Sequence, residues 1–148
     1  MARYLMRIRT DRPPAEVYGY LADVRNFADW DPGTKAARQV KGNGPGPGAE
    51  YDLDTAGATL RYVVDAYDPP VRIRLTGRNR FVTSVDTISV TADGQHGGQA
   101  GAVVTYEADL TGNGPFRVLE PVLKLAFNRL GDKSAEGLVD ALDGERLA

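Results

Sequence analysis

The sequence predicts an α+β fold in which a curved antiparallel sheet encloses a long C-terminal helix. The stretch from Pro115 to Asp143 places apolar residues at helical spacing, with most charged residues on the opposite side. The apolar residues include Leu119, Val122, Leu123, Phe127 and Leu130. One stripe of this helix must therefore be buried. Nearly all of the chain between Ala36 and Thr111 has the pattern of strands. A long apolar stripe after a run of strands indicates a sheet that covers the helix, and we expect a ligand cavity between them.

The strands are predicted from alternation of apolar and polar residues. Short loops between sequential strands favour an antiparallel meander. After the first strand, Asp11 can cap a short amphipathic helix that begins with Pro13 and Pro14, and a second apolar turn ends at Trp30. The predicted strands are Arg3–Arg9, Thr34–Lys41, Glu50–Thr55, Ala58–Tyr67, Val71–Thr76, Phe81–Ala92 and Ala102–Leu110.

Two glycine-rich stretches are predicted to be turns. The segment from Gly42 to Gly48 has the sequence GNGPGPG, which indicates a wide hairpin turn at the rim of the sheet. A phosphate-binding loop is the alternative, but it requires a lysine and a following apolar helix that this segment lacks. From Asp93 to Gly101 we expect a polar turn that exposes His96, which as a lone histidine is a poor candidate for catalysis.

Three residues in the C-terminal helix are unusual for a helix interior. Pro121 removes a hydrogen bond, so the helix either starts near Glu120 or kinks there. Gly131 and Gly137 each lower helix stability by about 1 kcal/mol relative to alanine. We favour close packing against the sheet as the reason for both glycines, and a bend that opens the cavity is the alternative.

Composition excludes several classes of site. The 148 residues fit one domain, and the net charge of −2 gives no general attraction to nucleic acid or anionic membranes. The chain has no cysteine and one histidine, which excludes disulfides, thiolate catalysis and multi-histidine metal sites. We therefore expect neither a metal nor another cofactor.

The N-terminal stretch from Met1 to Thr10 has no apolar core of signal-peptide length. No stretch approaches the roughly 20 apolar residues that cross a bilayer. We expect a cytoplasmic protein without an integral membrane segment, as a monomer or homodimer.

Several short motifs resemble one known family. They are DRPPAEVY at 11–18, LADV at 21–24, FADWDP at 27–32, YDPP at 67–70 and GP at 114–115, before a leucine-rich helix. With the order of elements, they resemble the polyketide cyclase/dehydrase and lipid-transport family. This is the bacterial branch of the SRPBCC superfamily, which contains START domains and the birch pollen allergen. The resemblance implies a helix-grip fold, with a seven-stranded sheet around the C-terminal helix and a hydrophobic pocket. It implies no single activity.

The pocket should be lined by the inward strand faces and the helix stripe. For each candidate, plain core packing is the alternative to ligand contact. The candidates are Tyr51, Leu53, Leu60, Tyr62, Val64, Ile73, Leu75, Ser84, Asp86, Ile88, Tyr106, Leu119, Leu123 and Phe127.

Asp86 is the polar candidate with the clearest chemistry. Its neighbours at period two, Ser84 and Ile88, place it on the predicted interior face. Burial would raise the pKa of its carboxyl group unless donors or a cation compensate. Asp86 could then act as a general acid or base beside Tyr62 or Tyr106.

A structural role is the alternative for Asp86, namely pairing at the cavity mouth with Arg74, Arg78 or Arg80, which belong to a nearby basic cluster. That cluster comprises Arg72, Arg74, Arg78 and Arg80, which we interpret as a solvated strand face, with contact to anionic lipid or phosphate as the alternative.

Trp30 and Asp31 are expected to be structural. The indole would plug the end of the core and the carboxylate would cap a turn.

Two functions remain open. The preferred one is binding or carriage of a hydrophobic small molecule (a lipid, quinone or polyketide-like compound). It rests on the apolar helix stripe and on the lack of a nucleophile–base pair. The alternative is a polyketide cyclase or dehydratase that uses Asp86 with Tyr62 or Tyr106 for proton transfer. The enzyme would need at least two polar groups converging inside the pocket.

Overall fold

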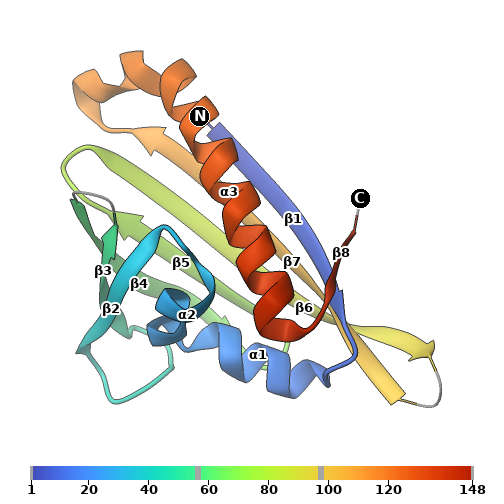
Figure 1. Ribbon diagram of the computed structural model, residues 1–148. Helices are drawn as coiled ribbons and strands as arrows, with labels where there is room; N and C mark the ends of the chain where they lie inside the picture. Colours follow the sequence, from blue (N-terminus) through green and yellow to red (C-terminus); the bar gives the residue numbers. More distant parts are fainter. Residues whose placement is uncertain (1, 56–57, 97–98, 148) are drawn as a thin grey trace.

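The sheet contains eight antiparallel strands in the order β2-β3-β4-β5-β6-β7-β1-β8 (Figure 1). The computed structural model describes residues 2–55, 58–96 and 99–147, and the side chains of residues 95–100 lie outside this description. The strands are β1 (Ala2–Thr10), β2 (Thr34–Lys41), β3 (Glu50–Thr55), β4 (Ala58–Asp68), β5 (Arg72–Arg78), β6 (Val82–His96), β7 (Gln99–Gly112) and β8 (Glu145–Leu147).

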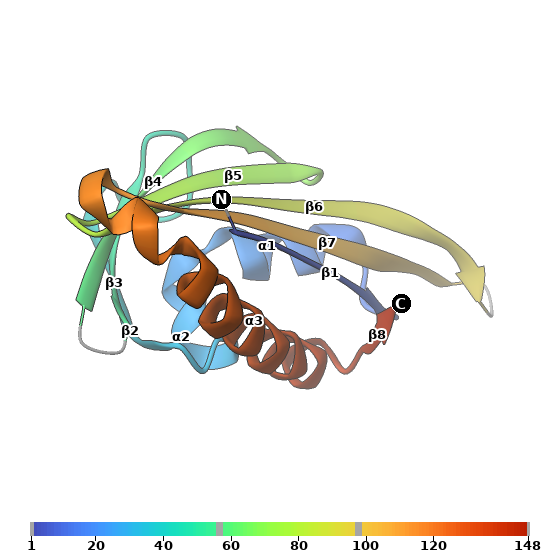
Figure 2. The same cartoon turned by 90° about the horizontal axis from the view of Figure 1, so that it is seen from above.

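The helices lie together on one side of this sheet, and the strands β2 and β3 bend around them (Figure 2). The long helix crosses the sheet beside the two short ones (Figure 1). These helical elements are α1 (Pro14–Ala22), η1 (Val24–Asn26), α2 (Phe27–Trp30), η2 (Gly114–Leu119) and α3 (Glu120–Leu142).

The predicted α+β fold is confirmed, with eight strands rather than seven. The extra strand β8 pairs with β1, and its three residues are too few to show a period-two pattern. The turn predicted from Asp93 to Gly101 is much shorter, because β6 continues to His96 and pairs there with Gln99. The helix α3 begins at Glu120, so Pro121 lies in its first turn, where no intrahelical hydrogen bond is lost.

The core lies between the sheet and the helices, namely α1, η1, α2 and the C-terminal half of α3. In that half Ala135, Leu138 and Leu142 are buried. The predicted burial of the first half is wrong in part: Leu119 is 47% exposed, Val122 67% and Leu130 50%. Periodicity identifies side chains that share a helix face, but it does not show how far the sheet extends beneath that face.

Gly131 and Gly137 are sites of close packing. A Cβ at Gly131 would lie 2.5 Å from the ring of Tyr4, and one at Gly137 would lie 1.9 Å from the carbonyl oxygen of Trp30. The structure therefore confirms close packing against the sheet for Gly131, whereas Gly137 packs against the backbone of α2 and not against the sheet.

The exposure of Val122 leads to a testable expectation. Val122→Ala should change the free energy of unfolding by less than about 0.5 kcal/mol, because the side chain is already largely in water. Urea unfolding monitored by circular dichroism measures this change. A loss above about 1 kcal/mol would show that the valine is buried in solution.

Candidate binding pocket

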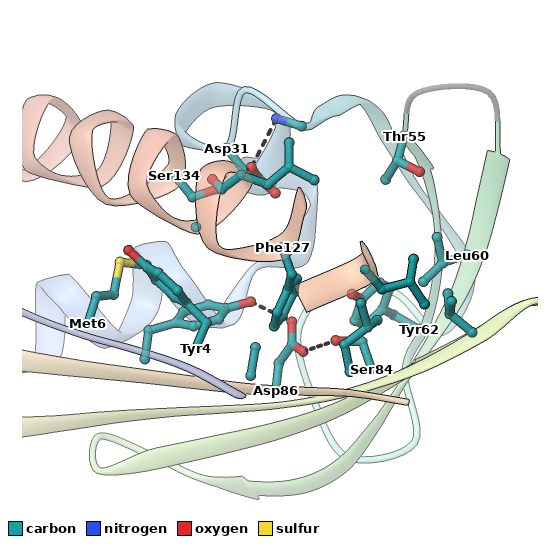
Figure 3. A pocket seen from close by; sticks show the side chains of 18 of the residues that line it. Tyr4, Met6, Asp31, Thr55, Leu60, Tyr62, Ser84, Asp86, Phe127 and Ser134 are labelled. Atoms are coloured by element: carbon teal, nitrogen blue, oxygen red, sulfur yellow. Dashed lines mark hydrogen bonds between the residues drawn. The ribbon is translucent and has the colours of Figure 1, made fainter. Parts of the chain in front are cut away.

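A cavity of about 320 Å³ lies between α3 and the inner face of the sheet (Figure 3). Strands from both halves of the sheet contribute to its wall, together with the turn after α2 and the N-terminal half of α3. Its lining residues are Tyr4, Met6, Trp30, Asp31, Gly33, Thr55, Leu60, Tyr62, Val82, Ser84, Asp86, Tyr106, Ala108, Leu110, Leu123, Phe127, Leu130, Gly131 and Ser134.

Asp86 on β6 is the centre of the polar wall. The Ser84 hydroxyl donates to Asp86 Oδ1 at 2.6 Å, and the Tyr106 hydroxyl donates to Asp86 Oδ2 at 2.5 Å. The side chains come together because Ser84 and Asp86 are two residues apart on β6, while Tyr106 lies on the paired strand β7. Asp86 is only 3% exposed, so it faces the interior and not an arginine at the mouth.

Tyr62 reaches this cluster from two strands away, across Gly77. The register places Tyr62 on β4 opposite Gly77 on β5, and Gly77 opposite Ser84 on β6. A Cβ at Gly77 would lie 2.3 Å from Tyr62 Cζ, so the phenol ring occupies the space that any other side chain would fill. The absence of a side chain at Gly77 therefore lets the phenol interact with Ser84 and Asp86.

Burial raises the pKa of Asp86 to about 6, although the hydroxyl hydrogen bonds oppose this shift. Burial, with the nearby Asp86 charge, also raises the pKa of Tyr62 and of Tyr106 well above the usual value for a phenol. At neutral pH the cluster is therefore a carboxylate held by neutral hydroxyl groups.

Asp31 forms a second polar group on the helix side of the cavity (Figure 3). Its Oδ1 accepts from the Gly33 backbone N–H at 3.0 Å and from the Ser134 hydroxyl at 2.7 Å, and its Oδ2 accepts from Thr34 at 2.9 Å. Asp31 thus caps the turn after α2 and ties that turn to α3. The hydrogen bond from Ser134 therefore holds α3 next to the cavity.

Tyr4 forms part of the wall beneath α3. Its hydroxyl donates to Asp132 at 2.8 Å and accepts from Arg146 at 2.8 Å, so the ring is held between β1, α3 and β8. Its ring meets that of Phe127 edge-on, with centroids 6.4 Å apart.

The sequence matches the family described as polyketide cyclase / dehydrase and lipid transport over residues 1–143. The chain belongs to this family. A search of the curated proteins found no match.

Solved structures similar to this polyketide cyclase/dehydrase and lipid-transport family member share its fold. A START superfamily protein from Mycobacterium smegmatis has a TM-score of 0.72 at 14% identity, covering 97% of this chain and 98% of its own. The protein XoxI from Bacillus cereus has a TM-score of 0.69 at 15% identity, covering 96% of each chain. The protein MLL2253 from Mesorhizobium loti has a TM-score of 0.62 at 16% identity, covering 92% of this chain and 96% of its own.

Seven of the predicted site residues of this family member lie together in the cavity wall. They are Leu60, Tyr62, Ser84, Asp86, Tyr106, Leu123 and Phe127. Six others are buried in the core but do not line the cavity: Tyr51, Leu53, Val64, Ile73, Leu75 and Ile88. Leu119 is exposed and lies outside both.

The sequence analysis did not assign Tyr4, Trp30, Asp31 or Ser134 to the pocket. Trp30 and Asp31 keep the structural contacts expected of them, and they also line the cavity. The available signal was the position of Trp30 and Asp31 at the end of the second short helix, where the following turn can face the open end of the sheet.

The other candidate sites have fewer groups suited to binding or catalysis. The arginines Arg72, Arg74, Arg78 and Arg80 are exposed, in agreement with a solvated face. In the described ranges, no cluster of three or more histidine, cysteine or acidic residues has metal-binding geometry, and no helix is long and apolar enough to cross a membrane.

The ring of Tyr62 over Gly77 leads to a second expectation. In Gly77→Ala the new methyl group would displace the Tyr62 ring, at a cost of about 1–3 kcal/mol in stability. Because Tyr62 lowers the pKa of Asp86, that pKa should rise above about 6. Carboxyl ¹³C NMR titration measures it. In a Tyr62→Phe background the same change at Gly77 should no longer alter the pKa of Asp86, and an equal shift in both backgrounds would contradict this role for Tyr62.

Proposed function

We propose that this chain is a ligand-binding domain that binds or carries a hydrophobic small molecule in the cavity beneath α3. The observation that supports this is the cavity itself, an apolar space with a few convergent polar groups, as small-molecule sites usually have. The family and the fold are consistent with binding of a hydrophobic ligand.

The volume favours a compact ligand. Drug-sized ligands occupy pockets of roughly 300–1,000 Å³, and the cavity lies near the lower end of that range at about 320 Å³. A ring system or one short chain fits this space better than a lipid with two acyl chains. Quinone-like and polyketide-like compounds meet this requirement.

A cyclase or dehydratase activity is the second candidate, supported by the convergence of Asp86, Tyr62 and Tyr106 on one wall. A carboxylate with a pKa near 6 is suited to proton transfer at neutral pH. Binding is preferred because both oxygens of Asp86 already accept hydrogen bonds from hydroxyl groups. Taking a proton from a substrate would weaken one of these bonds. Turnover of a linear poly-β-ketone that is lost in Asp86→Asn would establish the enzyme.

Titration with the neutral fluorescent hydrophobe N-phenyl-1-naphthylamine tests the binding function. Ala108 lines the cavity and pairs with Asp86 in the sheet, so Ala108→Leu would fill part of the space. We expect the unmodified protein to bind the probe and Ala108→Leu to weaken binding about tenfold or more.

Thr105→Leu is the matched control, because Thr105 lies on the same strand but does not line the cavity. It should bind the probe as the unmodified protein does. If the unmodified protein does not bind the probe, and if protein purified without detergent also yields no hydrophobe by native mass spectrometry, the proposed function is wrong.

A further inference from the structure

The charged groups on the cavity wall all have the same sign. Asp31 and Asp86 line the cavity, and the described lining residues include no lysine, arginine or histidine. Asp86 is almost completely buried, and its hydrogen-bond partners are the hydroxyl groups of Ser84 and Tyr106. The cavity therefore holds a buried negative charge that is stabilised by hydroxyl donors. No cationic side chain among these described lining residues neutralises it.

One cation that contacts a lining residue, Arg146, is engaged elsewhere. Arg146 donates to the Tyr4 hydroxyl, but it does not line the cavity and it also pairs with Asp132 at 3.2 Å. Lys124 and Arg129 on α3 are exposed. A charge that enters the cavity with a ligand would therefore interact first with Asp86 and Asp31.

The rest of the wall is rich in aromatic rings, which attract cations through their faces. The Trp30 and Tyr106 rings meet edge-on with centroids 5.8 Å apart, and Tyr106 also donates to Asp86. The aromatic lining residues are Tyr4, Trp30, Tyr62, Tyr106 and Phe127. A buried carboxylate among aromatic faces is a suitable environment for an organic ammonium group.

We propose that the cavity selects its ligand by charge: it binds an apolar molecule that carries a protonated amine and rejects apolar molecules that carry a carboxylate or phosphate. This proposal rests on the proposed binding function and specifies the ligand class. The ammonium group would donate to the remaining lone pairs of Asp86, in addition to the two hydroxyl donors. A ligand carboxylate would instead be placed beside Asp86 in a poorly solvated space, where like charges repel strongly.

Displacement of N-phenyl-1-naphthylamine by three ligands that share the same naphthyl ring system and differ in their polar group tests this selectivity. The ligands are 2-(1-naphthyl)ethylamine, 2-(1-naphthyl)ethanol and 1-naphthaleneacetic acid. At pH 7.5 we expect the amine to bind about tenfold more tightly than the alcohol, since hydrogen bonds to charged groups contribute about that much. The acid should bind about tenfold more weakly than the alcohol.

Two variants locate the charge that selects the ligand. In Asp86→Asn the ratio of amine to alcohol affinity should fall to about one, whatever the absolute affinities. Asp65→Asn is the matched control, because Asp65 is an exposed β4 carboxylate outside the cavity, and it should keep the tenfold ratio.

The amine preference should also depend on pH. The titratable groups that line the cavity with Asp86 are Tyr62 from β4, Tyr106 from β7, Tyr4 from β1 and Asp31 after α2, and α3 presents only Leu123, Phe127, Leu130, Gly131 and Ser134. Because protonation removes the Asp86 charge, the ratio should begin to fall as the pH drops below about 6.

The outcomes separate the two proposals. If the neutral probe does not bind and native mass spectrometry also finds no hydrophobe, the binding function itself fails. If the probe binds but the acid competes as well as the amine, or if Asp86→Asn keeps the tenfold ratio, the charge selectivity is overturned and the binding function stands.

Discussion

Replacement of Asp86 by asparagine is expected to stabilise the protein at pH 8 by up to about 3 kcal/mol. Burial raises the pKa of Asp86 from 3.8 to about 6, so the folded protein binds the Asp86 proton more tightly than the unfolded chain does. This difference between the two pKa values means that ionised Asp86 lowers the free energy of unfolding by about 3 kcal/mol above pH 6. Asparagine has nearly the same shape and avoids the charge. Of the Ser84 and Tyr106 hydroxyls, one can donate to its amide oxygen while the other accepts from its amide nitrogen.

The stability gained in Asp86→Asn should depend on pH. The stability that comes from protonation of Asp86 is fully present below pH 3.8 and is lost as the pH rises through about 6. The difference between the variant and the unmodified protein should therefore be largest at pH 8 and close to zero at pH 3 or below. Urea unfolding at a series of pH values measures this difference.

Asp52→Asn is a control with the opposite sign. Hydrogen bonds from Arg61 lower the pKa of Asp52, so the ionised carboxylate stabilises the fold at neutral pH. This variant should lose stability at pH 8, and its deficit should disappear as the pH falls below the ordinary pKa of an aspartate. If Asp86→Asn behaved in the same way as Asp52→Asn, the ionised Asp86 would not be unfavourable in the fold.

A carboxylate that destabilises the fold at neutral pH points toward a functional role. Packing alone would be met by an uncharged residue of similar shape, whereas binding or proton transfer requires the charge. The expected gain from Asp86→Asn and the expected loss of amine preference in the same variant are therefore two results of one buried charge.

The period-two pattern of the strands predicted much of the fold and the polar wall. Because Ser84, Asp86 and Ile88 alternate along one strand, the sequence placed Asp86 inside, and the structure agrees. The same alternation placed Ile73 and Leu75 inside, but they lie in the core and not in the cavity wall. Alternation identifies the face of a strand, whereas the cavity occupies only part of that face.

Core side chains cover one part of the inner face of the sheet, and the other part borders the cavity. The division between the two depends on tertiary contacts that sequence spacing does not encode. The helix α1 packs against β6 and β7. Its Tyr18 hydroxyl donates to the carbonyl of Arg72, at the start of β5, at 2.9 Å, and the Tyr18 ring meets Tyr67. The bond from Ser134 to Asp31 joins residues 103 positions apart, and no local pattern predicts it. The missed pocket residues follow from such contacts.

Replacement of Gly137 by alanine is expected to destabilise the protein by about 2 kcal/mol. The new methyl carbon would lie 1.9 Å from the Trp30 carbonyl oxygen and 3.0 Å from its carbon. Because these are backbone atoms and not the end of a flexible side chain, α3 must move away from α2. Overpacking of this kind costs about 1–3 kcal/mol and occasionally more, which outweighs the gain of about 1 kcal/mol in helix propensity.

The same displacement should reach the cavity. Ser134 is one turn before Gly137 on α3, and its hydroxyl holds Asp31 at 2.7 Å. Movement of α3 away from α2 should lengthen this bond and weaken binding of the neutral probe. Urea unfolding and probe titration on the same variant measure the two effects.

Gly19→Ala separates the clash at Gly137 from the general effect of replacing a helical glycine. Gly19 lies in α1, and a Cβ there would have no atom within 4 Å, so this variant should be more stable by about 1 kcal/mol. The two alanine substitutions should thus change stability in opposite directions. If Gly137→Ala were also stabilising, α3 would not pack against Trp30 in solution as closely as the structure shows. The volume of the cavity between α3 and the sheet would then be larger than about 320 Å³.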